Sequence, residues 1–136
     1  MINGKSVTVG LVDDDKVFQF ITGKILRSLN VIDSLLQFEN GLPLLEYLQN
    51  NFDKSESLPD VIFLDIQMPF MDGWQFLQEY SNLQISFTKQ IKIYILSSSI
   101  SLYDKEKAKA YNHIKDFLVK PVGRDIYTKI LEESCK

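Results

Sequence analysis

The sequence predicts an α/β fold in which a doubly wound, five-stranded parallel sheet is covered by helices on both faces. Short apolar runs alternate five times with amphipathic segments of helical spacing. Two of these runs, residues 7–12 and 61–64, are rich in Val and Ile, as expected of strands that are buried on both faces. Acidic residues follow both strands directly, at the positions where open parallel sheets bind ligands.

The first two β–α repeats are expected within residues 7–48. A strand over residues 7–12 should lead into a helix over residues 16–29, with Asp15 as the N-cap. The apolar residues of that helix recur at helical spacing: Phe18, Ile21, Ile25 and Leu29. A short second strand is expected over residues 35–38, and helical spacing resumes over residues 42–48.

The third repeat begins with the strongest strand signal of the chain, residues 61–64, which follows a polar loop over residues 51–59. The Asp72-Gly73 pair is a turn signal and leads into a helix that starts with Trp74. Residues 81–90 have only a weak pattern, so we expect a loop there.

The last two repeats follow the same scheme. Strands are expected over residues 92–96 and 116–119, and a charged helix with a thin apolar stripe over residues 102–112. A final helix over residues 124–134 closes the chain, and two of its residues are expected to be buried: Ile126 and Ile130.

Composition indicates one ordinary globular domain, residues 1–136, with a core over about residues 7–134. The net charge of -3 provides no basic footprint for nucleic acid. No apolar stretch is long enough for a membrane span, and the first residues lack the apolar segment of a signal peptide. The single Cys135 excludes an internal disulfide, so we expect a cytoplasmic location.

The chemically informative residues all follow the ends of predicted strands. Asp13 and Asp14 follow the first strand, Asp65 the third, Ser97 the fourth and Lys120 the fifth. Because the carboxyl ends of parallel strands share one edge of the sheet, these side chains should meet in one pocket. Gathered carboxylates repel one another unless a cation joins them, and oxygen ligands suit Mg²⁺. The sequence therefore predicts a metal–carboxylate site with a hydroxyl and an ammonium beside it.

This pattern resembles the response regulator receiver domain, the CheY-like family of two-component signalling. The resemblance covers the chain from about Thr8 to Ser134. It rests on four pieces in the family's order: Asp13-Asp14-Asp15, Asp65-x-x-Met68-Pro69-x-x-Asp72-Gly73, Ser97 and Lys120-Pro121. It implies a flavodoxin-like sheet with strand order 2-1-3-4-5 and a phosphoacceptor in place of an enzyme.

The resemblance also implies the role of each acidic residue. Asp65 would be the phosphoacceptor, and a carboxylate can indeed form an acyl phosphate. Asp14, Asp65 and the backbone carbonyl of Gln67 would ligate Mg²⁺, or Mn²⁺, directly. Asp13 would act largely through a metal-bound water.

Four further roles follow from the same resemblance. Lys120 would pair first with the carboxylate and then with the phosphoryl group. The Ser97 hydroxyl would bond a phosphoryl oxygen and move inward together with the ring of Phe117, as the switch. Gln67 and Ser99 occupy the two variable positions that would set the lifetime of the phosphate.

The partners implied are a histidine kinase or a histidine phosphotransfer protein as phosphoryl donor, and a downstream protein. The downstream protein would bind the surface of the fourth helix, fifth strand and fifth helix, where Tyr103, Lys107 and Tyr111 are candidate contacts. Neither nucleic acid nor membrane is expected as a partner, and the chain should be a monomer or a weak dimer.

Three other functions compete with this interpretation. A metal-dependent aspartyl-phosphate phosphatase needs a second acid two residues after its nucleophile, and Asp13 and Asp15 have that spacing. A degenerate receiver that only binds partners would not need the complete set of site residues. A flavodoxin-like FMN carrier would need a Ser/Thr/Gly-rich loop where this chain has acids.

Other conspicuous residues have simpler interpretations. Trp74 is expected to pack partly against its surroundings, and His113 to lie on the surface. Five phenylalanines are expected in the core: Phe18, Phe20, Phe38, Phe63 and Phe76.

Overall fold

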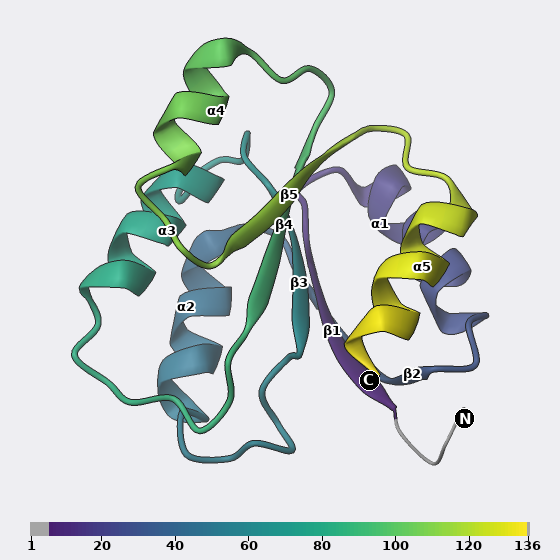
Figure 1. Cartoon of the computed structure of the whole chain (residues 1–136), viewed down its shortest axis with the longest axis horizontal. Coiled ribbons are helices and arrows are strands. Elements are labelled where there is room, and N and C mark those ends of the chain that lie inside the picture. The colour runs from purple at the N-terminus through teal and green to yellow at the C-terminus, as the bar shows by residue number, and fades with distance from the viewer. Residues whose placement is uncertain (1–5, 136) are drawn as a thin grey trace.

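A computed structural model describes residues 6–135, which contain five parallel strands and five alternating helices (Figure 1). The strands are β1 (Val7–Val12), β2 (Ile32–Phe38), β3 (Val61–Asp65), β4 (Lys92–Ser97) and β5 (Ile114–Val119). The helices are α1 (Lys16–Arg27), α2 (Gly41–Asn50), α3 (Gly73–Asn82), α4 (Leu102–Ala108) and α5 (Arg124–Ser134). The strand order is β2-β1-β3-β4-β5, which confirms the flavodoxin-like α/β prediction. Residues 1–5, where the sequence lacks a signal peptide's apolar segment, lie outside the described residues.

Helices cover both faces of the sheet. Helices α1 and α5 lie on one face, and α2, α3 and α4 on the other (Figure 1). Leu26 of α1 and Tyr127 of α5 are buried in the core on the first face. Leu44 of α2 and Phe76 of α3 are buried in the core on the second. The central strands β1 and β3 are buried over their whole length, as their apolar composition predicted.

The register of the strands determines which residues meet at the carboxyl edge. Val12 of β1 is level with Leu64 of β3, so the residues that follow them, Asp13 and Asp65, lie side by side. Ser97, the last residue of β4, is level with Val119, the residue before Lys120. The topology therefore gathers the chemically informative residues at one edge.

Several element bounds differ from the sequence prediction. Strand β2 begins at Ile32, three residues earlier than expected, because an edge strand tolerates polar residues such as Asp33 and Ser34. Strand β5 begins at Ile114 for the same reason. Helix α4 ends at Ala108, four residues before the expected end, and Tyr111 beyond it packs on the core.

The predicted apolar stripe of α1 was partly wrong. Ile21 and Phe20 are exposed, while Thr22, Gly23 and Leu26 face the sheet. In α5 likewise, Ile126 is exposed, and its neighbour Tyr127 is buried together with Ile130. Within residues 6–135, no helix is long and apolar enough to cross a membrane.

Candidate functional site

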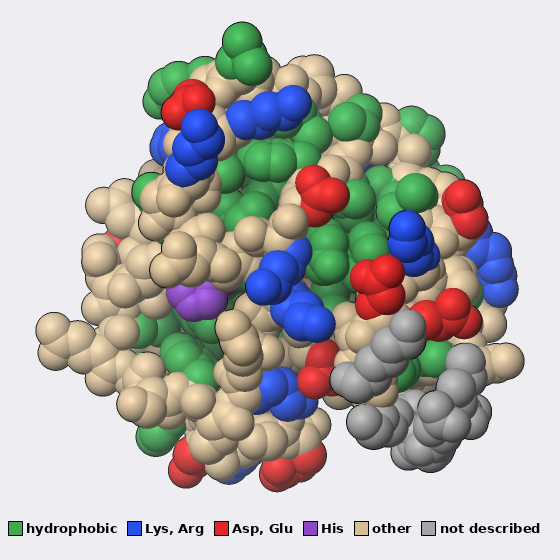
Figure 2. Space-filling view, viewed as in Figure 1, with side chains coloured by type: hydrophobic (Ala, Val, Ile, Leu, Met, Phe, Trp, Pro, Cys, Tyr) green, Lys and Arg blue, Asp and Glu red, His purple; other side chains and the backbone are tan. Residues whose placement is uncertain are grey.

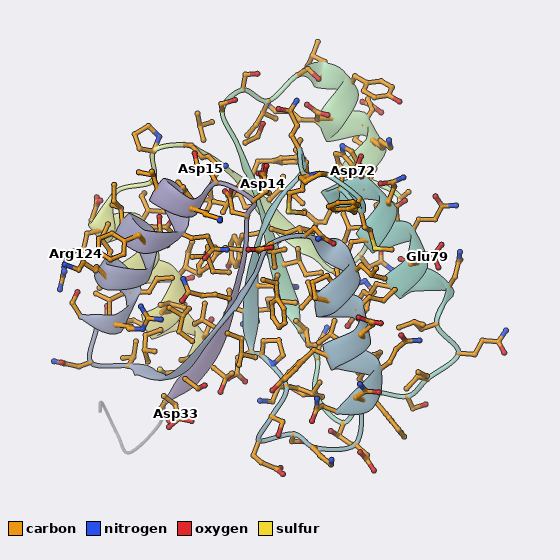
Figure 3. All side chains as sticks on the ribbon, turned by 180° about the vertical axis from the view of Figure 1, so that it is seen from behind. Asp14, Asp15, Asp33, Asp72, Glu79 and Arg124 are labelled. Carbon is orange, nitrogen blue, oxygen red and sulfur yellow. The ribbon has the colours of Figure 1, made fainter. Side chains whose placement is uncertain are left out.

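Three carboxylates converge at the carboxyl edge of the sheet. Asp13, Asp14 and Asp65 each offer one oxygen, and these oxygens lie within 4.8 Å of one another. Asp13 and Asp65 are buried, whereas Asp14 is exposed. Figure 3 shows Asp14, Asp15 and Asp72 at this end of the sheet and Asp33 at the opposite end. The site therefore opens to solvent on the side of Asp14.

Lys120 bridges the two buried carboxylates from the end of β5. Its Nζ lies 2.6 Å from Asp13 Oδ2 and 3.4 Å from Asp65 Oδ2. It also lies 4.5 Å from the centroid of the Phe18 ring, within the range of a cation–π contact. Burial opposes the charged ammonium, but the hydrogen bond to Asp13 and the charges of Asp65 and Asp13 outweigh it and raise the pKa of Lys120. The peptide bond between Lys120 and Pro121 is cis.

The protein environment raises the pKa of the Asp65 carboxyl. Burial is the main cause that raises its pKa from 3.8 to about 6, and the negative charge of Asp13 adds to the effect. The Gln67 N–H, which donates to Oδ1 at 3.1 Å, and the nearby Lys120 oppose the rise. The ionised form of Asp65 is therefore unfavourable in the folded protein, and a bound cation would reduce this free-energy cost.

The acidic turn after β1 is built by its own side chains. Asp13 Oδ1 accepts the N–H of Asp15 at 2.9 Å, which turns the backbone at Asp14. The Asp15 carboxylate accepts the N–H groups of Val17 and Phe18 and caps α1. This confirms the predicted N-cap and directs the third acid of the run away from the cluster.

The loop after β3 needs a glycine to pass close to Asp65. A Cβ at Gly73 would lie 2.8 Å from the Asp65 carbonyl oxygen and 2.8 Å from the Ile66 Cα. Asp72 and Gln75 form a reciprocal capping box that starts α3 directly behind this contact. The Asp-Gly pair of the sequence therefore sets both the turn and the approach of α3 to the site.

Ser97 and Phe117 lie near the site, but their hydroxyl and ring are not directed at the carboxylates. Ser97 Oγ donates to the Ser99 carbonyl at 2.5 Å, within its own loop. Phe117 is half-buried and packs against the core beneath α2 and α3. Gln67 and Ser99 are both exposed. The switch and phosphate-lifetime roles of these residues stay predictions.

The donor set fits a divalent cation. Three carboxylates against one ammonium leave two formal negative charges, which is the charge that Mg²⁺ or Mn²⁺ neutralises. All the converging ligand atoms are carboxylate oxygens, the type that Mg²⁺ and Mn²⁺ prefer. The exposure of Asp14 leaves a path for a partly hydrated ion and for a substrate.

The family follows from a comparison of the sequence with models of known protein families. The model of the response regulator receiver domain matches residues 9–132. The chain is a member of this family. Receiver domains of the CheY type act in two-component signalling as phosphoacceptors and not as ordinary enzymes, and the family implies a histidine kinase as partner.

Related proteins contain a similar sequence, either as a small part of a longer protein or as nearly the whole protein. The chain is 28% identical over 125 residues to the sensor histidine kinase CheAY of Helicobacter pylori, and 31% identical over 133 residues to a protein-glutamate methylesterase/protein-glutamine glutaminase of Treponema pallidum. Each alignment covers 92% of this chain but only 14% and 29% of those proteins. The chemotaxis protein CheY of Listeria monocytogenes is 30% identical over 126 residues, which is 93% of this chain and 97% of CheY.

Solved structures share the fold of this receiver domain. A two-component response regulator from Cytophaga hutchinsonii has a TM-score of 0.82 at 21% identity and covers 96% of this chain and 98% of its own. The receiver domain of a sensor histidine kinase from Pseudomonas aeruginosa has a TM-score of 0.75, with the same identity and the same coverage. That structure contains a magnesium ion coordinated in the active-site cleft.

The structure brings together Asp13, Asp14, Asp65 and Lys120 as the sequence predicted. Sequence reasoning missed Gln19, whose amide bonds the backbone of the acidic turn, and the contact of Phe18 with Lys120. The helical spacing of Phe18 could have indicated a position facing the site, whereas a lone glutamine gives no such signal.

Trp74 and His113, the other two conspicuous residues of the sequence, both pack against neighbouring side chains. Trp74 is half-buried and has the Lys107 ammonium 5.1 Å from its ring centroid, which confirms its predicted partial packing. His113 is not a free surface residue, since it packs edge-on against Tyr80 at 4.8 Å between ring centroids.

Proposed function

We propose that this receiver domain takes a phosphoryl group from a phosphohistidine donor onto Asp65, with Mg²⁺ bound by Asp13, Asp14 and Asp65. The observation that carries the proposal is the position of the Lys120 ammonium between two buried carboxylates, beside a third that faces solvent. By analogy with other receivers of the family, the backbone carbonyl of Gln67 in this chain would be a further ligand of the Mg²⁺ ion.

Each residue has a distinct part in the proposed transfer. An Asp65 carboxylate oxygen attacks phosphorus, the bond from phosphorus to the histidine nitrogen breaks, and the donor imidazole takes up a proton as it leaves. Lys120 donates to the transferred phosphoryl group as the negative charge of the carboxylate is lost. When bound, Mg²⁺ would neutralise charge on the phosphoryl oxygens.

The carboxylate cluster supports this transfer better than an aspartyl-phosphate phosphatase mechanism. That alternative needs Asp15 as a general acid or base near Asp13. The Asp15 carboxylate instead accepts two backbone N–H groups at the start of α1, at 2.9 and 3.1 Å. This cap holds the Asp15 carboxylate at the start of α1, and Asp15 is not one of the three carboxylates that converge in the cluster.

The output would be a change in protein binding on the surface of α4, β5 and α5. Figure 2 shows charged side chains of both signs interspersed with hydrophobic ones on the face that carries β5 and α5. Tyr103 is exposed there, while Lys107 and Tyr111 are partly covered by contacts with Trp74. Phosphorylation would shift Ser97 and Phe117, and so alter this surface.

Acetyl phosphate with Mg²⁺ followed by intact mass measurement tests the proposal. The wild type should gain one phosphoryl group, about 80 Da. Asp65→Asn should gain none, and the matched control Asp53→Asn, in the exposed loop after α2, should behave as wild type. EDTA should abolish the gain in the wild type and in Asp53→Asn. A wild type that stays unmodified beside a reactive receiver control would refute the phosphoacceptor role and favour the degenerate receiver.

A further inference from the structure

Gln19 of α1 ties the acidic turn to the ends of two strands. Its side-chain amide nitrogen lies 3.0 Å from the Asp13 carbonyl oxygen, 2.9 Å from that of Phe38 and 3.2 Å from that of Leu11. The Phe38 carbonyl also accepts the N–H of Asp13 at 3.1 Å. One amide therefore fastens β1, β2 and the turn that carries Asp13 and Asp14.

A second glutamine fixes the orientation of the Gln19 amide. Gln37 Nε2 donates to Gln19 Oε1 at 2.8 Å, and Arg27 donates to Gln37 Oε1 at 2.7 Å. Because the oxygen of Gln19 is occupied by a donor, its nitrogen must face the three carbonyl groups. The network thus requires an amide at position 19, with the nitrogen toward the acidic turn.

The Asp13 carbonyl is the bond that matters most for the metal site. It belongs to the peptide group that contains the N–H of Asp14, so fixing it fixes the direction in which Asp14 leaves the backbone. Asp14 is exposed, and no hydrogen bond or ion pair from residues 6–135 reaches its carboxylate. The constraint that these residues place on Asp14 therefore acts through its backbone.

We infer that Gln19 is a positioning residue for the divalent cation of the proposed function, acting through the Asp13–Asp14 peptide. Groups that orient metal ligands from behind commonly change affinity by about 10–100-fold when removed. Gln19 touches neither the proposed ion nor the phosphoryl group. Its contribution is that the Asp13–Asp14 peptide group needs no reorientation when the cation arrives.

Mg²⁺ titration by calorimetry of the full chain tests this role. Gln19→Met keeps the length of the side chain and removes every hydrogen bond of its amide group, and should raise the Mg²⁺ dissociation constant about tenfold. Gln78→Met makes the same change on the exposed side of α3 and should leave the constant unchanged. Gln37→Met removes the donors to the Gln19 side-chain and backbone oxygens and the acceptor of Arg27, but it leaves the Gln19 amide nitrogen on the three carbonyl groups, so it should give a smaller rise.

Gln19→Glu separates geometry from charge. A carboxylate at position 19 adds negative charge beside a cation site, so charge alone would tighten Mg²⁺ binding. It cannot donate to the three carbonyl groups, so the positioning role requires weaker binding. Tighter binding in this variant, or a dissociation constant for Gln19→Met within about twofold of the wild type, would overturn the inference.

Urea unfolding in EDTA distinguishes positioning from general stability. Loss of stability with unchanged Mg²⁺ affinity would mean that Gln19 is only structural. A wild type that binds Mg²⁺ but accepts no phosphoryl group would refute the proposed function alone. A wild type that binds no Mg²⁺ would refute both.

Discussion

The Asp65→Asn substitution should stabilise the metal-free protein, although it removes the proposed phosphoacceptor. Burial raises the pKa of the Asp65 carboxyl from 3.8 to about 6, so the folded protein holds its charged form at a cost. Below pH 3.8 the carboxyl is protonated in both states and the cost is absent. The cost grows as the pH rises toward about 6 and is complete above that value.

The magnitude follows from the same two pKa values. The difference between 3.8 and about 6 corresponds to about 3 kcal/mol of the free energy of unfolding. The amide of the variant still accepts the Gln67 N–H but sets a donor against the Lys120 ammonium, which we expect to cost about 1 kcal/mol. The net gain above pH 6 should be about 2 kcal/mol.

Urea denaturation in EDTA across a pH series measures this difference. The midpoint should rise by about 1 M above pH 6 and the difference should shrink as the pH falls toward 3.8. Asp53→Asn, the exposed control, should show no difference at any pH. In a parallel series without EDTA, Mg²⁺ at about a hundredfold its dissociation constant should add about 2.7 kcal/mol to the wild type, and less to Asp65→Asn. A variant that is less stable than the wild type, or a gain independent of pH, would refute this reasoning.

Three other substitutions test the parts of the site separately. Lys120→Met should lower the free energy of unfolding by about 2 kcal/mol in EDTA, because two buried carboxylates lose their counter-ion, and should tighten Mg²⁺ binding; weaker binding by calorimetry would contradict it. Gly73→Ala should cost about 2 kcal/mol or more, measured by thermal unfolding, because its Cβ would lie 2.8 Å from the Asp65 carbonyl oxygen. An unchanged melting temperature would show that the loop relaxes freely. Asp15→Ala should cost about 1 kcal/mol in urea as a lost N-cap and leave phosphorylation by acetyl phosphate intact; loss of phosphorylation would revive a chemical role for Asp15.

The sequence was sufficient for the fold class and for the residues at the carboxyl edge. Apolar runs placed Asp65 and Lys120 at strand ends, and parallel topology brings such ends together whatever the loops between them do. The acidic cluster could thus be predicted without any knowledge of side-chain geometry.

Helix faces and strand lengths were less predictable. The apolar spacing of α1 suggested that Ile21 would be buried, but the helix turns Thr22 and Gly23 toward the sheet instead. A periodic pattern fixes the existence of an amphipathic helix more securely than its rotation, especially where apolar residues lie on two sides. The edge strands β2 and β5 extended into polar residues, because one side of an edge strand need not be buried.

The supporting contacts of the site could not be predicted at all. Gln19 and Gln37 are separated by 18 residues and join only after β1, β2 and α1 are assembled. Their amides follow no motif, and either could equally face solvent on an isolated element. Such contacts depend on the packing of the elements, which the local sequence does not encode.

The most direct test of the central claim is to locate the phosphoryl group on the chain. Acetyl phosphate and Mg²⁺ treatment, reduction of the acyl phosphate with borohydride and peptide mapping by mass spectrometry would identify the modified residue. The proposed function requires the reduced label at Asp65, with none in EDTA. A reduced label at another aspartate such as Asp14, or no label under conditions that modify another receiver, would contradict it.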